Sequence, residues 1–131
     1  MNNLLKVVII SIICFLYGGI WYGVIFAETW QKLNKITPET INEMNLIRVY
    51  LGSFMCIFIM NIAIFVIIDN MSQDSLIENV AMGTIIGFGL LAASTANNYI
   101  YHQKSLKAYL IDAGYQATFP ILSSFLLFKI P

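Results

Sequence analysis

The chain has 131 residues, of which 59% are hydrophobic and only 11% are charged, and its mean hydropathy is +0.77. An average soluble domain carries roughly 25% charged residues, so this composition excludes an ordinary water-soluble domain and indicates a lipid environment. Seven basic and seven acidic side chains give a net charge of zero, which supplies no field that would attract nucleic acid, and we expect no nucleic-acid partner.

Four stretches are long enough to cross a bilayer as helices: residues 7–27, 49–68, 79–101 and 108–128. A hydrocarbon core of about 30 Å requires roughly 20 residues, because each helical residue rises about 1.5 Å. The first three stretches carry no charge, and the fourth carries only Asp112. Unpaired backbone amides are costly in lipid. We therefore predict an all-α fold in which residues 1–131 form one domain, an integral membrane bundle of four transmembrane helices.

A cleaved signal peptide is the main alternative for the first stretch, because Lys6 precedes an apolar run. That run is longer than the usual apolar region of about 7 to 15 residues. Ala27, the nearest small residue, has Ile25 rather than a small residue two places before it. We therefore predict that the first stretch is retained as a span.

The first loop contains a pattern typical of a surface-bound helix. Trp30, Leu33 and Ile36 recur every three residues and are interleaved with polar side chains, which suits the membrane interface. Thr37 followed by Pro38 is a helix start, since proline is well tolerated in the first turn. We predict a short amphipathic helical segment in this loop.

The distribution of basic residues predicts the orientation in a bacterial inner membrane. The first and third loops together hold five basic residues: Lys32, Lys35, Arg48, Lys104 and Lys107. The opposite side has Lys6 and Lys129, and its loop, residues 69–78, contains three acids and no base. This bias predicts a multi-pass protein of the cell membrane with both termini outside, although Lys6 alone favours the reverse orientation.

The third span begins at a capping box, Ser75 with Glu78. Projection at about 100° per residue places one set of small and polar residues on a single face: Gly83, Gly87, Leu90, Ser94, Asn97, Asn98 and Tyr101. The Gly83-x-x-x-Gly87 step allows another backbone to approach closely. We expect these glycines to pack inside the monomer, and a dimer seam is the alternative.

The fourth span has a polar face of its own, formed by Asp112, Tyr115, Gln116, Phe119 and Ser123. A carboxylate at membrane depth costs roughly 2.5 to 3.5 kcal/mol and is normally paired or functional. We expect the amides of Asn97 and Asn98, or the guanidinium of Arg48, to bond Asp112. The bonded carboxylate is then either a structural lock between helices or a proton or cation site.

Polar side chains gather in the half of the bundle next to the basic loops, which predicts a cytoplasm-facing polar pocket for an unidentified small molecule. The residues expected to line it are Trp21, Glu28, Arg48, Asn97, Asn98, Tyr101, Asp112, Tyr115 and Gln116.

The sequence favours no catalytic chemistry. His102, the single histidine, is expected in the third loop, so haem ligation inside the bundle and serine–histidine catalysis both lack a partner at membrane depth. Cys14 and Cys56 lie in separate apolar runs without metal-ligand spacing. We expect no enzyme, no cofactor and no metal site.

Two classes of function remain open. The first is a non-enzymatic membrane protein that works by assembly, as a homodimer or higher homo-oligomer packed through its glycine faces, or by ligand binding. The alternative is a small dimeric proton-coupled transporter that uses the intramembrane carboxylate of Asp112.

Two segments resemble the prokaryotic membrane-protein family catalogued as domain of unknown function 1761. Residues 19–30, GIWYGVIFAETW, are similar to the family pattern of Trp-Tyr, a small residue or proline, Phe and then Trp. Residues 98–116 are similar to its loop and Ile-Asp/Asn-Ala-Gly-Tyr segment. Gly23 stands where proline is common, and Gln116 where histidine is often found. The resemblance spans nearly the whole chain and implies four helices without implying an activity.

Overall fold

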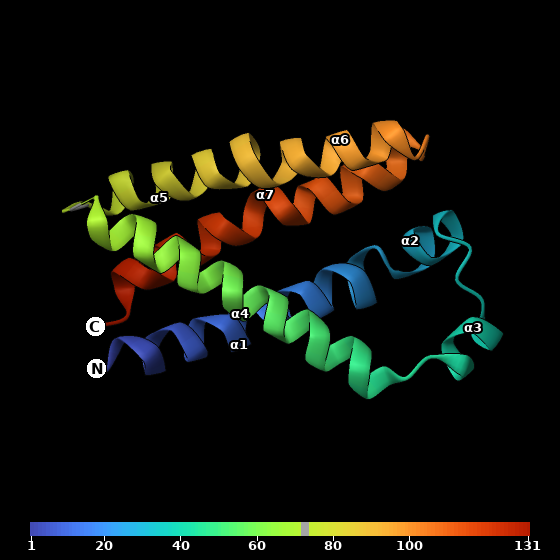
Figure 1. Ribbon diagram of the computed structural model, residues 1–131, viewed down its shortest axis with the longest axis horizontal. Coiled ribbons are helices and arrows are strands. Elements are labelled where there is room, and N and C mark those ends of the chain that lie inside the picture. Colours follow the sequence, from blue (N-terminus) through green and yellow to red (C-terminus); the bar gives the residue numbers. More distant parts are fainter. Residues whose placement is uncertain (72–73) are drawn as a thin grey trace.

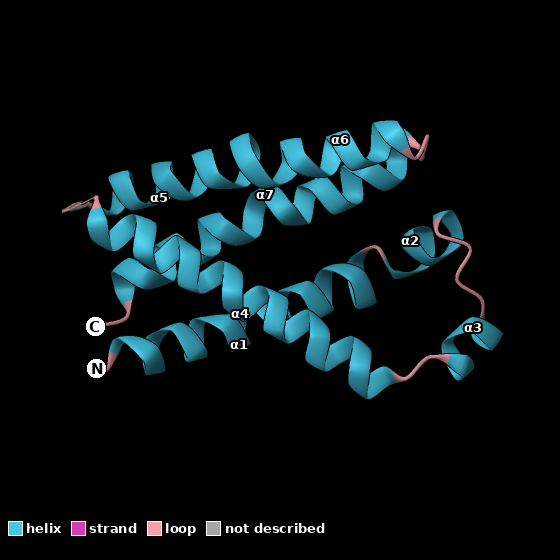
Figure 2. Cartoon of the chain, in the orientation of Figure 1, coloured by secondary structure: helices cyan, strands magenta, loops and turns pink. Residues whose placement is uncertain are grey.

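The computed structural model describes residues 1–71 and 74–131, and the regular structure in these ranges is helical throughout (Figure 2). The predicted all-α fold is therefore confirmed. Residues 72 and 73, within the acidic loop used to predict the orientation, lie outside the described residues. In chain order the elements are α1 (Asn3–Ile20), the π-helix η1 (Trp21–Ile25), α2 (Ala27–Leu33), α3 (Pro38–Glu43), α4 (Leu46–Asn70), α5 (Leu76–Thr84), the π-helix η2 (Ile85–Ala92), α6 (Ala93–Tyr101) and α7 (Leu106–Lys129).

Three helices are long and apolar enough to cross a membrane: Asn3–Ile25, Leu46–Asn70 and Leu76–Tyr101. They support the prediction of a membrane protein. The predicted fourth span corresponds to α7, whose 24 residues extend about 36 Å. Its polar side chains lower its hydropathy, so α7 is not among the helices that qualify by length and composition.

The lower hydropathy of α7 has a structural reason, because α7 is the central helix of the bundle. It packs against α1, α4, α5, η2 and α6 (Figure 1). Its buried residues are Ala108, Ile111, Ala113, Tyr115, Ala117, Phe119, Pro120, Ser123, Ser124 and Leu127. A helix covered by other helices presents little surface to lipid, so it tolerates hydroxyl and amide groups that a lipid-facing helix would not.

The two chain termini lie at one end of the bundle, and the first loop with α2 and α3 lies at the other end (Figure 1). The turn between α6 and α7 is at the same end as α2. Both predicted helix starts are confirmed. Thr37 caps α3 by accepting a hydrogen bond from the Thr40 amide at 3.2 Å, and Ser75 and Glu78 form the reciprocal capping box of α5. Local side-chain signals therefore set these boundaries.

Candidate functional site

Three segments of the chain meet at the half-buried carboxylate of Asp112 on α7. Its Oδ1 atom accepts a hydrogen bond from the Tyr22 hydroxyl at 2.8 Å and another from Trp30 Nε1 at 3.0 Å. Its Oδ2 atom accepts a hydrogen bond from the Tyr99 hydroxyl. Tyr22 belongs to η1, Trp30 to α2 and Tyr99 to α6. We refer to these four residues as the Asp112 cluster. The cluster joins η1, α2 and α6 to α7.

The third long helix presents a different face to α7 from the one predicted, because its middle is π-helical. Its buried positions include Asn79, Gly83, Gly87, Ala92 and Tyr99. The step of four from Asn79 to Gly83 lies in the α-helix α5. The step of five from Gly87 to Ala92 crosses η2, where hydrogen bonds join residues five apart. One extra residue in a turn rotates all later positions by about 100°.

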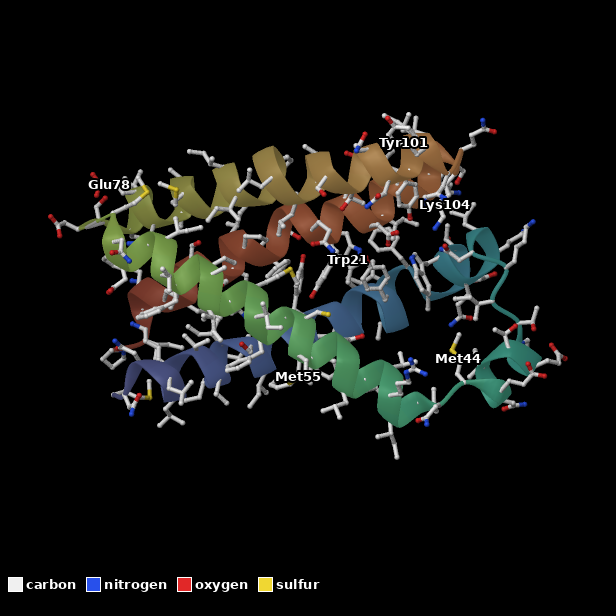
Figure 3. All side chains as sticks on the ribbon, viewed as in Figure 1. Trp21, Met44, Met55, Glu78, Tyr101 and Lys104 are labelled. Atoms are coloured by element: carbon white, nitrogen blue, oxygen red, sulfur yellow. The ribbon has the colours of Figure 1, made fainter. Side chains whose placement is uncertain are left out.

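This rotation corrects the predicted partners of Asp112. Asn97 and Asn98 are exposed, and Tyr101 is 80% exposed and points away from the bundle (Figure 3). Tyr99, which was not predicted as a site residue, is only 9% exposed and donates to Asp112. Uniform helical periodicity missed Tyr99. The one available signal was its chemistry, since a tyrosine at this depth has an apolar ring and a polar tip that needs a partner.

A similar shift occurs at the end of the first helix. In η1 the Phe26 amide donates to the Trp21 carbonyl oxygen at 3.0 Å, a step of five residues. Trp30, four residues after Phe26, therefore lies at Asp112, whereas Glu28 is exposed. Glu28 was expected to line the polar pocket, and the change of register in η1 turns it outward, as η2 does for Asn97 and Asn98.

Arg48 is the other expected partner that lies elsewhere. It is exposed near the start of α4, where every residue from 42 to 53 is exposed. In the described part of the chain, the hydrogen-bond partners of Asp112 are the three aromatic donors and not this guanidinium.

Two of the remaining predicted residues lie inside the bundle beside Asp112. Trp21 Nε1 donates to the carbonyl oxygen of Ile111 at 3.0 Å. The indole ring lies so close to Gly114 that a Cβ there would be 2.8 Å from it. Tyr115 is buried and Gln116 is half-buried on the same helix. Trp21 and Tyr115 therefore join the first helix to α7 next to the Asp112 cluster.

The glycines of the third helix lie against α7 of the same chain. A Cβ added at Gly87 would come closest to the carbonyl oxygen of Ala117, and would be 2.8 Å from its carbonyl carbon and 3.0 Å from its Cα. One added at Gly83 would be 2.5 Å from Ser124 Oγ and 2.6 Å from the Pro120 carbonyl oxygen. Since neither position has room for a side chain, both glycines permit close contact between α7 and the α5–η2 helix.

A second polar group is fully buried between α1, α4 and α7. Asn61 Nδ2 donates to Ser11 Oγ at 3.1 Å, and Ser123 Oγ donates to Asn61 Oδ1 at 2.6 Å. Ser11 Oγ in turn donates to the Val7 carbonyl oxygen at 2.7 Å. Each side chain has a partner, so this group acts as an internal hydrogen-bonded link between three helices.

Two surface hollows lie away from Asp112. An apolar groove of about 480 Å³ is lined by Tyr17, Val80, Thr118, Ile121, Leu122 and Phe125. A more polar hollow of about 300 Å³ near the termini is lined by Lys6, Phe65, Ile68, Asp69, Asp74, Asn79, Leu127 and Phe128. At Asp112 itself aromatic side chains pack together, with the Tyr22 and Trp30 ring centroids 5.2 Å apart. None of the residues predicted to form the polar pocket lines either of these two hollows.

One cation lies at the edge of the Asp112 cluster. Lys104 Nζ is 5.2 Å from the centroid of the Tyr99 ring, and Figure 3 shows Lys104 at the turn between α6 and α7. Among the described residues, no group of three His, Cys, Asp or Glu side chains is placed to hold a metal ion. The Asp112 carboxyl group is thus enclosed by aromatic donors, and the Lys104 ammonium lies on the outside of the same aromatic shell.

The family comparison covers the whole of this site. The model of the family described as "Protein of unknown function (DUF1761)" matches residues 5–128, which include every member of the Asp112 cluster. No curated protein and no solved structure matches the chain. As its sequence resemblance implied, the chain belongs to the DUF1761 family.

Proposed function

We propose that this chain is a non-enzymatic membrane protein that binds a small ligand at Asp112, in a site that α2 closes. One observation carries the proposal: in the described residues the carboxyl group is bonded by neutral donors, and one of them, Trp30, belongs to a short loop helix. Burial of a carboxyl group at membrane depth costs free energy, so such groups usually have a structural or functional role. These neutral donors give each carboxyl oxygen a hydrogen bond but supply no positive charge. A ligand can therefore supply the positive charge that balances the carboxylate.

The attachment of α2 supports its role as the closing segment. It has seven residues, none of them buried. Phe26, with φ of −113°, interrupts the helix before α2, and Lys35, with a positive φ of 55°, follows it. The Trp30 bond to Asp112 and the ring contact between Trp30 and Tyr22 hold it in place. Few contacts mean a small free-energy difference between closed and open positions of α2.

We further propose that α7 is the fourth span, with both termini outside and α2 at the cytoplasmic surface. The length of α7 and the shared end of the two termini support this arrangement. After Cys14 and Cys56 are replaced by serine, Glu39→Cys and Asp74→Cys can each be treated with an impermeant maleimide on intact cells. We expect labelling at position 74 only, and labelling at position 39 only would reverse the topology.

Tryptophan fluorescence tests whether water-borne ligands can reach the site, because the chain has only two tryptophans and both lie there. Trp21→Phe leaves Trp30 as the single emitter. In vesicles we expect acrylamide to quench its emission strongly and acyl-chain-brominated lipids to quench it weakly. The control is Trp30→Phe, which reports on Trp21, whose indole bonds the neighbouring Ile111 carbonyl oxygen. Quenching of Trp30 by brominated lipid alone would place it in hydrocarbon and exclude the proposed site.

Proton-coupled transport is the second candidate. The neutral donors around Asp112 favour it, because a proton that binds the carboxyl group would not have to displace a cationic hydrogen-bond partner. Such a transporter is expected to form at least a dimer and to move protons when substrate is present. Size measurement in mild detergent and a proton-flux assay in liposomes distinguish the candidates. A strict monomer without flux contradicts transport, whereas substrate-dependent flux that is lost in Asp112→Asn contradicts a binding role alone.

A further inference from the structure

We infer that the Asp112 cluster is a binding site for an organic ammonium ion, and that the side chain of Lys104 is its internal competitor. This inference rests on the proposed function, because it names the ligand class of the same site. The observations that carry it are the neutral shell around Asp112, the ring faces that surround it and the position of Lys104 on one of them.

The carboxyl group can interact with a cation without losing its present bonds. A carboxylate has about four acceptor positions. Three are used, by Tyr22 and Trp30 at Oδ1 and by Tyr99 at Oδ2. The described residues therefore leave Oδ2, beside the Tyr99 ring, able to attract a cation by its charge and, where the cation carries an N–H, to accept a hydrogen bond from it.

Aromatic rings surround the carboxyl group, and the face of such a ring attracts cations through the ring quadrupole. In edge-to-face contacts the Tyr22 ring lies 5.2 Å from the Trp30 ring and 5.4 Å from the Tyr115 ring, and the Tyr99 ring lies 5.7 Å from that of Tyr109. A carboxylate surrounded by such rings suits an ammonium with organic substituents. A hard metal ion instead requires several oxygen ligands, and the described residues offer no cluster of three metal-binding side chains.

The position of Lys104 shows that this aromatic shell already attracts an ammonium group. Lys104 Nζ is 5.2 Å from the Tyr99 ring centroid, within the range of a cation–π contact, and the hydroxyl of the same ring bonds Asp112. Lys104 is exposed at the α6–α7 turn, so its side chain can move away. A free ammonium ion that binds Asp112 would compete with it for the Tyr99 face.

The experiment titrates benzyltrimethylammonium against the emission of Trp30 in the Trp21→Phe protein, in detergent. Neopentylbenzene, which has the same shape without the charge, is the matched ligand control. We expect saturable binding of the cation alone. Asp112→Asn should weaken it by about tenfold or more, since a charged partner is lost. Lys104→Met should tighten it by about two- to fivefold, because a competing cation–π contact is removed.

Lys107→Met is the matched protein control, since Lys107 is an exposed lysine three residues further along the chain; it should leave the affinity unchanged. Equal binding of the neutral compound, or equal effects of Lys104→Met and Lys107→Met, would overturn the inference. If Asp112→Asn does not fold by circular dichroism, the comparison of the two lysine variants still decides. Absence of ammonium binding together with strong acrylamide quenching of Trp30 would refute the ligand class alone and leave the proposed site standing.

Discussion

Replacement of Gly87 by alanine is expected to push α7 away from the third helix. A Cβ at this position would come closest to the carbonyl oxygen of Ala117 and would lie 2.8 Å from its carbonyl carbon. Carbon atoms pack best at about 3.5 to 4.0 Å, so α7 would have to retreat by roughly 0.7 Å or more. The obstacle is backbone in the central helix of the bundle, and it cannot rotate aside as a side chain could.

Overpacking of this kind costs about 1 to 3 kcal/mol. Gly89→Ala is the matched control, because Gly89 lies in the same π-helix and a Cβ there would meet nothing within 4 Å. Alanine at position 89 should leave the free energy of unfolding unchanged or raise it by up to about 1 kcal/mol through the lower chain entropy of the unfolded state.

Unfolding of both variants in mixed micelles, followed by circular dichroism, gives the two free energies. We expect Gly87→Ala to be at least about 1 kcal/mol less stable than Gly89→Ala. Equal stabilities would mean that the two backbones do not touch. If Gly87→Ala instead lost a dimer while the monomer kept its stability, the glycines would form a seam between two copies.

Two further predictions concern single hydrogen bonds. Tyr99→Phe removes a donor to the Asp112 carboxyl group and should lower the free energy of unfolding by about 1 to 3 kcal/mol, whereas Tyr101→Phe, at an exposed position, should have no effect; the reverse order would restore the uniform helical register. For the buried polar group, a double-mutant cycle of Asn61→Ala and Ser123→Ala should give a coupling of about 0.6 kcal/mol and at most about 1.7 kcal/mol, and a coupling of zero would mean that this bond adds nothing to stability.

Features that depend on neighbouring residues could be predicted from the sequence. The caps at Thr37 and Ser75 are confirmed because a capping side chain bonds an amide only three residues away. The approximate lengths of the long helices could likewise be predicted from the lengths of the uncharged runs. Whether α7 spans the membrane is harder to predict from hydropathy. Its polar residues, Asp112 among them, are tolerated because α7 lies at the centre of the bundle, and hydropathy does not reveal that position.

The partners of Asp112 could not be predicted by projection of a uniform helix, since they depend on where two helices change register. Alternating steps of three and four from Gly87 lead through Leu90 and Ser94 to Asn97 and Asn98. The step of five through η2 leads instead to Ala92 and, seven residues later, to Tyr99. The apolar run IIGFGLLA contains no polar residue that would mark such a change.

The two π-helices occur in different spans, yet each precedes a donor to the same carboxyl group: η1 comes before Trp30, and η2 before Tyr99. A π-helical turn is less favourable than an α-helical one and persists where its surroundings stabilise it. Here each brings an aromatic donor to Asp112 that an unbroken α-helix would turn away. The irregular segments therefore assemble the Asp112 cluster, and a sequence change that restored α-helical geometry in η2 would remove Tyr99 from the site without altering any residue of the cluster.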